Sequence, residues 1–169
     1  MYGEWLRVTP AELERAQVDL VWLRDLADEL DEAYTGDDKT VSERRRFGTD
    51  KTWHALDYLL TRRGFPISII YGEKSFVDDP DDADADWGYG PPQYLTVAQV
   101  RQAADALAGL TEEQLLDGVQ QLDLERADIY PAVWDRPGEL EWAVCHLADA
   151  RTYFGAAAKA GDAIICWID

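Results

Sequence analysis

The stretch Ala163-Ile164-Ile165-Cys166-Trp167-Ile168 decides the fold expected for this chain of 169 residues. It is a continuous apolar run, rich in β-branched side chains, and a glycine at position 161 precedes it. Such a run without polar alternation is typical of a strand that is buried on both faces. We therefore expect residues 163–168 to form the central strand of a sheet.

A second strand and a helix are expected at the start of the chain. The run Glu4–Val8 alternates in character, which favours a strand. The sequence Thr9-Pro10-Ala11-Glu12 then places threonine, proline and glutamate where an N-terminal capping box needs them. Apolar residues recur after it at spacings of three and four, which predicts one helix running to about Tyr34.

The middle of the chain alternates between expected helices and extended segments. Residues 36–48 and 78–86 are expected to be loops, and the second of these is acidic. The remaining elements are a helix over Asp50–Arg62, a buried strand over Ile67–Tyr71, helices begun by capping boxes at Thr96 and Thr111, a short helix near 123–128, and a long helix from Pro137 to about Ala160.

These elements indicate an α+β fold. The length of the chain falls in the usual range for one domain and suffices to bury a hydrophobic core. We expect a single domain over residues 1–169, in which several helices pack on a small mixed β-sheet and the C-terminal strand is central.

Composition narrows the classes of partner. Sixteen basic and thirty-four acidic side chains give a formal net charge of −18 at pH 7. A field of this sign repels nucleic acids and anionic lipid surfaces, whereas a basic protein partner is compatible with it. No segment approaches the roughly 20 apolar residues of a membrane helix, and no signal peptide is visible, so we expect a cytoplasmic protein. Cys145 and Cys166 are expected to be reduced, buried thiols.

Five groups of residues occur in a distinctive order along the chain. They are Leu6-Arg7-Val8-Thr9-Pro10, then Asp50-Lys51-Thr52-Trp53-His54-Ala55-Leu56, then Gly88-Tyr89-Gly90-Pro91 with Tyr94-Leu95-Thr96, then Ile129-Tyr130-Pro131 with Trp134, and finally Tyr153-Phe154 before Gly161. Together they resemble the YfbM-like family, also numbered domain-of-unknown-function family 1877. The resemblance implies helices packed against a small sheet, and it implies no activity.

The helix expected over Asp50–Arg62 carries the strongest candidate for chemistry. At about 100° per residue, Trp53 falls on the apolar arc, while Asp50, His54 and Asp57 fall beside it. Either carboxylate is within reach of the His54 imidazole and would raise its pKa toward neutrality, as in an acid–base histidine. The alternative is that His54 hydrogen-bonds at the rim of the core and orients the helix.

Aromatic residues in two other segments complete the candidate pocket. They have apolar faces and polar ends, so they either line a small-molecule pocket or plug the ends of a domain. The full predicted pocket consists of Asp50, Trp53, His54, Asp57, Tyr89, Tyr94, Tyr130 and Trp134.

No cofactor and no metal site is predicted. Asp82, Asp84 and Asp86 alternate as at the start of an EF-hand loop. Trp87 stands where that loop needs a glycine and Gln93 where it needs a glutamate, so a solvated acidic loop is expected instead. Zinc-ligand spacing, a nucleophile elbow and a phosphate-binding glycine loop are also absent.

Two classes of function are compatible with these features. The favoured one is a non-catalytic binding or interaction domain that binds or neutralises a basic protein, as bacterial immunity proteins do, because negative charge speeds encounter with a cationic partner. The alternative is a small-molecule-binding domain or enzyme with its site around His54. Both are open from the sequence, and so is whether the chain is an enzyme.

Overall fold

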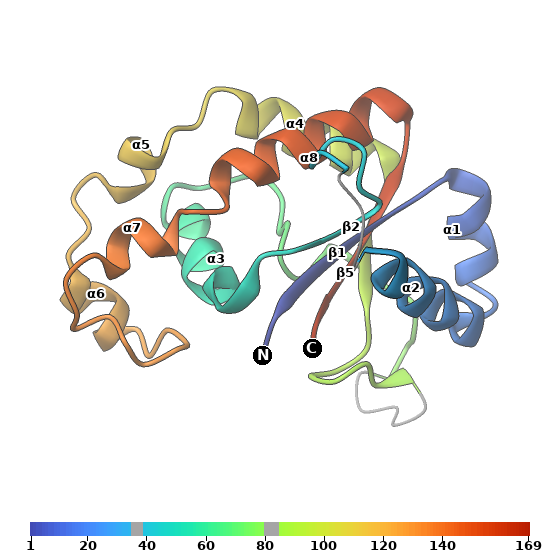
Figure 1. The fold of residues 1–169 in the computed structure, drawn as a ribbon, viewed down its shortest axis with the longest axis horizontal. Coiled ribbons are helices and arrows are strands. Elements are labelled where there is room, and N and C mark those ends of the chain that lie inside the picture. Colours follow the sequence, from blue (N-terminus) through green and yellow to red (C-terminus); the bar gives the residue numbers. More distant parts are fainter. Residues whose placement is uncertain (35–38, 80–84) are drawn as a thin grey trace.

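A five-stranded sheet forms the centre of the computed structural model, which describes residues 1–34, 39–79 and 85–169 (Figure 1). In spatial order its strands are β2 (Arg46–Gly48), β1 (Gly3–Val8), β5 (Ala163–Ile168), β4 (Gln93–Leu95) and β3 (Lys74–Ser75). β5 has a neighbour on each edge, and each of its residues is buried. The prediction of a central strand at the C-terminal end is confirmed.

Every pairing described in the sheet is antiparallel. The longest pairing joins β1 to β5, from Gly3 opposite Ile168 to Val8 opposite Ala163. In an antiparallel pair the second strand starts at the end of the sheet where the first one stops, and the long helical segments between β1 and β2 and between β4 and β5 make that return. The expected mixed sheet is therefore corrected to an antiparallel one.

Helices cover both faces of this sheet. They are α1 (Pro10–Ala16), α2 (Leu20–Tyr34), α3 (Trp53–Arg62) preceded by the 3-10 turn η1 (Asp50–Thr52), α4 (Val97–Ala108), α5 (Glu112–Leu116), α6 (Gln121–Arg126), α7 (Glu139–Ala143) and α8 (Leu147–Ala160). The predicted capping boxes at Thr9, Thr96 and Thr111 are present, and each begins a helix.

Alternate residues of the two central strands serve two separate hydrophobic clusters. Trp5, Ile164 and Cys166 belong to the cluster beneath α3, α4, α7 and α8, whereas Leu6 and Ile165 belong to the cluster beneath α1 and α2. Successive side chains of a strand point to opposite faces, so one apolar strand supplies both clusters. Figure 1 shows α1 and α2 on one side of the sheet and α3, α4 and α8 on the other.

Two of the predicted helices are each split in the structure. The helix expected from Pro10 to Tyr34 is broken after Ala16, because Asp19 accepts the Trp22 amide at 3.0 Å and starts α2 afresh. The helix expected after Pro137 is divided into α7 and α8 by a turn over residues 144–146.

Two other segments also differ from the sequence analysis. Ile67–Tyr71 forms turns instead of a strand, although Ile69 and Ile70 are buried. The apolar residues of this run are explained by their burial, without any strand pairing. Residues 46–48, placed in a loop, form the edge strand β2. Residues 35–38 and 80–84, including Asp82 and Asp84, lie outside the described residues.

Trp5 joins the sheet to the larger cluster. Its ring lies edge-on to Phe154 with centroids 5.0 Å apart and stacks on Tyr153 at 6.0 Å. Its indole N–H donates to the Ile69 carbonyl at 2.6 Å. The buried Tyr153 hydroxyl lies 2.7 Å from the Arg45 carbonyl and 3.2 Å from that of Trp5, so it can donate to either. These bonds satisfy polar groups that would otherwise be costly to bury.

None of the described helices is both long and apolar enough to cross a membrane. Both cysteines are free, as predicted. Cys166 is buried in β5, but Cys145 is exposed, which corrects the expectation that both thiols are buried.

Gly3→Ala tests the close approach of β1 to α3. A Cβ at position 3 would lie 2.5 Å from both Thr49 Oγ1 and Trp53 Cβ, and these two residues are buried. We expect the free energy of unfolding in urea to fall by about 1–3 kcal/mol. The matched control is Gly155→Ala on the exposed side of α8, where a Cβ meets nothing within 4 Å. It should raise stability by about 0.5–1 kcal/mol, and an equally stable Gly3→Ala protein would contradict the packing described.

Candidate functional site

Three of the predicted pocket residues meet at the start of α3. The His54 ring stacks on Trp53 with centroids 4.9 Å apart, and Trp53 lies 6.1 Å from Tyr130 at a shallow interplanar angle. His54 Nδ1 accepts the backbone N–H of Tyr130 at 3.0 Å. This bond fixes the Tyr130-Pro131 turn on α3, as the rim-of-core alternative for His54 anticipated.

The electrostatic environment of His54 differs from the sequence hypothesis. Burial lowers its pKa, and the nearby charge of Asp128 opposes this only in part. An imidazole that accepts a hydrogen bond at Nδ1 must be neutral at that atom, which agrees with the lowered pKa. The predicted rise in pKa caused by Asp50 or Asp57 is therefore not found.

Two polar groups one turn apart on α3, the Trp53 indole N–H and the Asp57 carboxyl, are withdrawn from water, and we call them the polar seam. Burial raises the pKa of Asp57 to about 6, and the pKa of Tyr71 is raised by burial and by the Asp57 charge. The Trp53 ring meets Tyr71 edge-on at 5.9 Å. The Trp53 indole N–H is buried without an acceptor in the part of the chain that the structure describes. A buried donor in this state costs about 1–3 kcal/mol.

The other predicted pocket residues lie elsewhere. Trp134 is buried, donates its indole N–H to the Ile129 carbonyl at 2.7 Å and stacks on Trp142. Tyr94 packs on Phe76 against the opposite face of the sheet. Tyr89 is exposed beyond the end of β5, where its amide donates to the Ile168 carbonyl. The eight residues do not form one site.

A cavity that the sequence analysis missed lies beside β2. Its volume is about 280 Å³, and we call it the central cavity. Of the predicted residues it contains only Asp50. Its lining consists of Tyr2, Glu4, Asp31, Arg44, Arg46, Phe47, Gly48 and Asp50. The run Arg44-Arg45-Arg46 was a visible signal, but only the pairing of β1 with β2 brings it beside Glu4.

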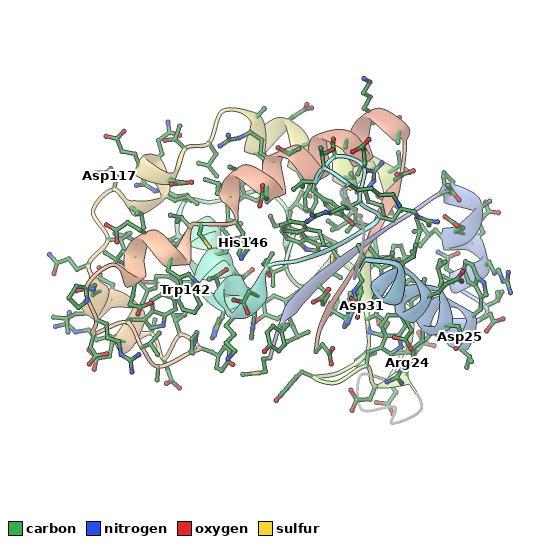
Figure 2. The ribbon with its side chains drawn as sticks, in the orientation of Figure 1. Arg24, Asp25, Asp31, Asp117, Trp142 and His146 are labelled. Carbon is green, nitrogen blue, oxygen red and sulfur yellow. The ribbon has the colours of Figure 1, made fainter. Side chains whose placement is uncertain are left out.

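Two further cavities adjoin the central one. Tyr2 and Asp50 also line a cavity of about 570 Å³ that reaches Pro131, Val133 and Trp142, and we call it the outer cavity. Arg46 also lines a small cavity of about 60 Å³ beside Trp87 and Trp167. Each of these two cavities shares lining residues with the central one, and we refer to the three together as the Tyr2–Arg46 groove. In Figure 2, Asp31 on α2 and Trp142 on α7 lie on either side of β1.

Arg46 forms a largely buried ion pair in the middle of this groove. Its Nε donates to Glu4 Oε2 at 3.0 Å, and both side chains are 14% exposed. Its Nη1 donates to the Ala27 carbonyl at 3.1 Å and lies 3.5 Å from Asp31. The pKa of Glu4 is raised nonetheless, because burial outweighs the attraction of Arg46. Arg46 therefore stabilises the charge of the Glu4 carboxylate only in part.

Among the described residues, no group of three or more His, Cys, Asp or Glu side chains is placed to hold a metal ion. Asp86, the described member of the aspartate run, accepts the Gly88 and Gly90 amides and orders that loop instead.

Comparison with known proteins places the chain in a family. Residues 1–167 match the profile described as Domain of unknown function (DUF1877). The chain belongs to this family. A solved structure titled as a protein of unknown function, YfbM from Escherichia coli, superposes with a TM-score of 0.67 over 98% of each chain, at 18% sequence identity. This likeness shows the fold, and a search of curated proteins finds no match. The resemblance to the YfbM-like family is confirmed.

His54→Ala tests the structural role of this imidazole within the DUF1877 fold. Removal of the acceptor leaves the Tyr130 amide unsatisfied at a partly buried position, so the free energy of unfolding should fall by about 1–3 kcal/mol. Urea denaturation followed by tryptophan fluorescence measures the change. A variant with unchanged stability would show that the bond does not hold the turn.

Asp57→Asn tests the polar seam through the pH dependence of stability. Folding raises the pKa of Asp57 from 3.8 to about 6, so protonation of this carboxyl favours the folded state. This contribution to stability is complete below pH 4 and is lost as the pH rises through about 6. The variant, which does not titrate, should match the parent near pH 4. As the pH rises to 7, the variant should become more stable than the parent, by on the order of 1 kcal/mol after allowance for solvent screening. A stability difference that is constant over this range would contradict the assignment.

Proposed function

We propose that the chain is a non-catalytic binding protein whose partner is a basic protein. In this proposal the partner contacts the outer face of α2 and the adjoining Tyr2–Arg46 groove. The partner is held mainly by opposite charge, and the ordered groove supplies the specificity.

The observation that carries the proposal is the charge of α2. Between Leu20 and Asp31 this helix exposes four carboxylates and one guanidinium. They belong to Asp25, Asp28, Glu29 and Asp31, and to Arg24. Asp28 and Asp31 also line the groove. An acidic face on a chain of net charge −18 attracts cationic proteins and speeds their encounter.

A small-ligand site beside Trp53 is the second candidate function. The Trp53 N–H lacks an acceptor among the described residues, and the Asp57 carboxyl is raised in pKa by burial alone. A small polar molecule that reached either group would supply a hydrogen-bond partner, but neither residue lines a cavity described above. This candidate is weaker, because Tyr89, Tyr94 and Trp134 lie away from the seam and a catalytic constellation is not assembled there.

Capture of a partner followed by charge reversal tests the binding proposal. The immobilised protein is exposed to a lysate of its source organism, bound proteins are identified by mass spectrometry, and the tightest one is purified for calorimetry. We expect a partner of high isoelectric point, with a Kd that weakens at least tenfold between 50 and 500 mM NaCl as its charges are screened.

Two triple variants distinguish the contribution of the α2 face to binding from that of the overall net charge. Asp25→Lys/Asp28→Lys/Asp31→Lys should weaken the Kd at least tenfold. Asp105→Lys/Glu113→Lys/Glu125→Lys makes the same change of net charge at exposed positions on α4, α5 and α6, and should weaken it less than threefold. Equal losses of affinity in the two variants would contradict the assignment of the surface. An acidic partner, or none, would contradict the proposed function.

A further inference from the structure

We propose that the central cavity of the Tyr2–Arg46 groove is a pocket for one arginine side chain of the partner. This inference rests on the proposed function, and it adds which side chain the partner inserts and where.

The Nε and Nη1 donors of Arg46 are already engaged within the protein. They reach Glu4, the Ala27 carbonyl and Asp31 at 3.0–3.5 Å. The guanidinium also lies 5.2 Å from the ring centroid of Trp167. The Nε of Arg44, the other guanidinium of the cavity, donates to the Lys39 carbonyl at 3.0 Å. An anionic ligand would therefore meet guanidiniums whose donors are partly engaged, in a cavity where carboxylates outnumber them.

The carboxylates of the cavity retain unused acceptors. Asp50 has no ion pair among the described residues, and Asp31 is 61% exposed although it touches Arg46. Only one oxygen of Glu4 is bonded to Arg46. Three carboxylates against two guanidiniums leave one negative charge in the cavity. A cationic side chain with several donors is the complement of this arrangement.

The size and the aromatic lining favour a guanidinium. A volume of about 280 Å³ is at the lower limit for small-molecule pockets, which suits a single long side chain. Tyr2 is 44% exposed, and Lys51 Nζ lies 5.8 Å from its ring centroid, so the surroundings of this ring already accommodate a cation. Arginine stacks on aromatic rings and pairs with carboxylates through two donors, which lysine cannot do.

Gly48 keeps the floor of the cavity open. A Cβ at this position would lie 2.9 Å from Glu4 Oε1, so any side chain there would displace the carboxylate. On the far side of Tyr2 and Asp50, the outer cavity presents Pro131, Val133 and Trp142. An apolar residue next to the arginine would pack on these side chains. The segment recognised is thus an arginine with an apolar neighbour.

Titration with short peptides, followed by NMR amide signals of the full chain, tests the pocket. The probes are acetylated Gly-Leu-Arg-Gly-Gly amide and the same peptide with citrulline, which has the shape of arginine without its charge. The arginine peptide should shift the signals of Tyr2, Gly48 and Asp50 and bind at least tenfold more tightly than the citrulline peptide. Equal affinity of the two peptides would overturn the proposal.

Two matched variants separate the pocket from the general field of the protein. Asp50→Asn removes one charge inside the cavity and keeps a residue type that tolerates the φ of 49° at this position. Asp105→Asn removes one charge from an exposed position on α4, outside the cavity and the α2 face. The first should weaken the arginine peptide at least fivefold, and the second less than twofold.

The pattern of results distinguishes this inference from the function on which it rests. A captured basic partner that tolerates Asp50→Asn, with equal peptide losses in both variants, would overturn the arginine pocket and leave the binding function intact. Failure to capture a basic partner would overturn the function instead, while selective arginine binding would still support a pocket for a smaller cationic ligand.

Discussion

The antiparallel pairing of β1 with β5 is the constraint on which the rest of the structure depends. Its register sends Trp5 and Cys166 to one face and Leu6 and Ile165 to the other. Both faces are apolar, so helices must cover each of them to remove that surface from water. A slip of one residue would exchange the two sets of side chains, and neither helical layer would then fit its face.

The candidate groove is a consequence of this arrangement. α2 must present its apolar stripe to the sheet, so its acidic residues face outward or toward the sheet edge, where β2 ends. Arg46 on β2 then meets Glu4 on β1 and Asp31 on α2. A buried pair of this kind seldom adds net stability, but breaking it is costly, and it therefore fixes the relative position of the three elements.

The sequence was sufficient where the signal is local. Capping boxes and the run over residues 163–168 are read from neighbouring residues, and they predicted helix starts and the central strand correctly. The candidate site depended on distant contacts. His54 accepts an amide 76 positions away, and Arg46 meets Glu4 across 42 positions, so spacing on one helix could not find either partner. The Ile67–Tyr71 run was mistaken for a strand because burial and strand pairing give the same apolar pattern.

The pairing of the first strand with the last has a consequence during synthesis. β1 leaves the ribosome before β5, its longest partner, which is made only after the helices between them. Trp5, Leu6 and Val8 therefore stay without that partner while the intervening chain is translated. Closing so long a loop also makes the final pairing slow. In the cell, the nascent chain should present this apolar edge to chaperones until β5 completes the sheet.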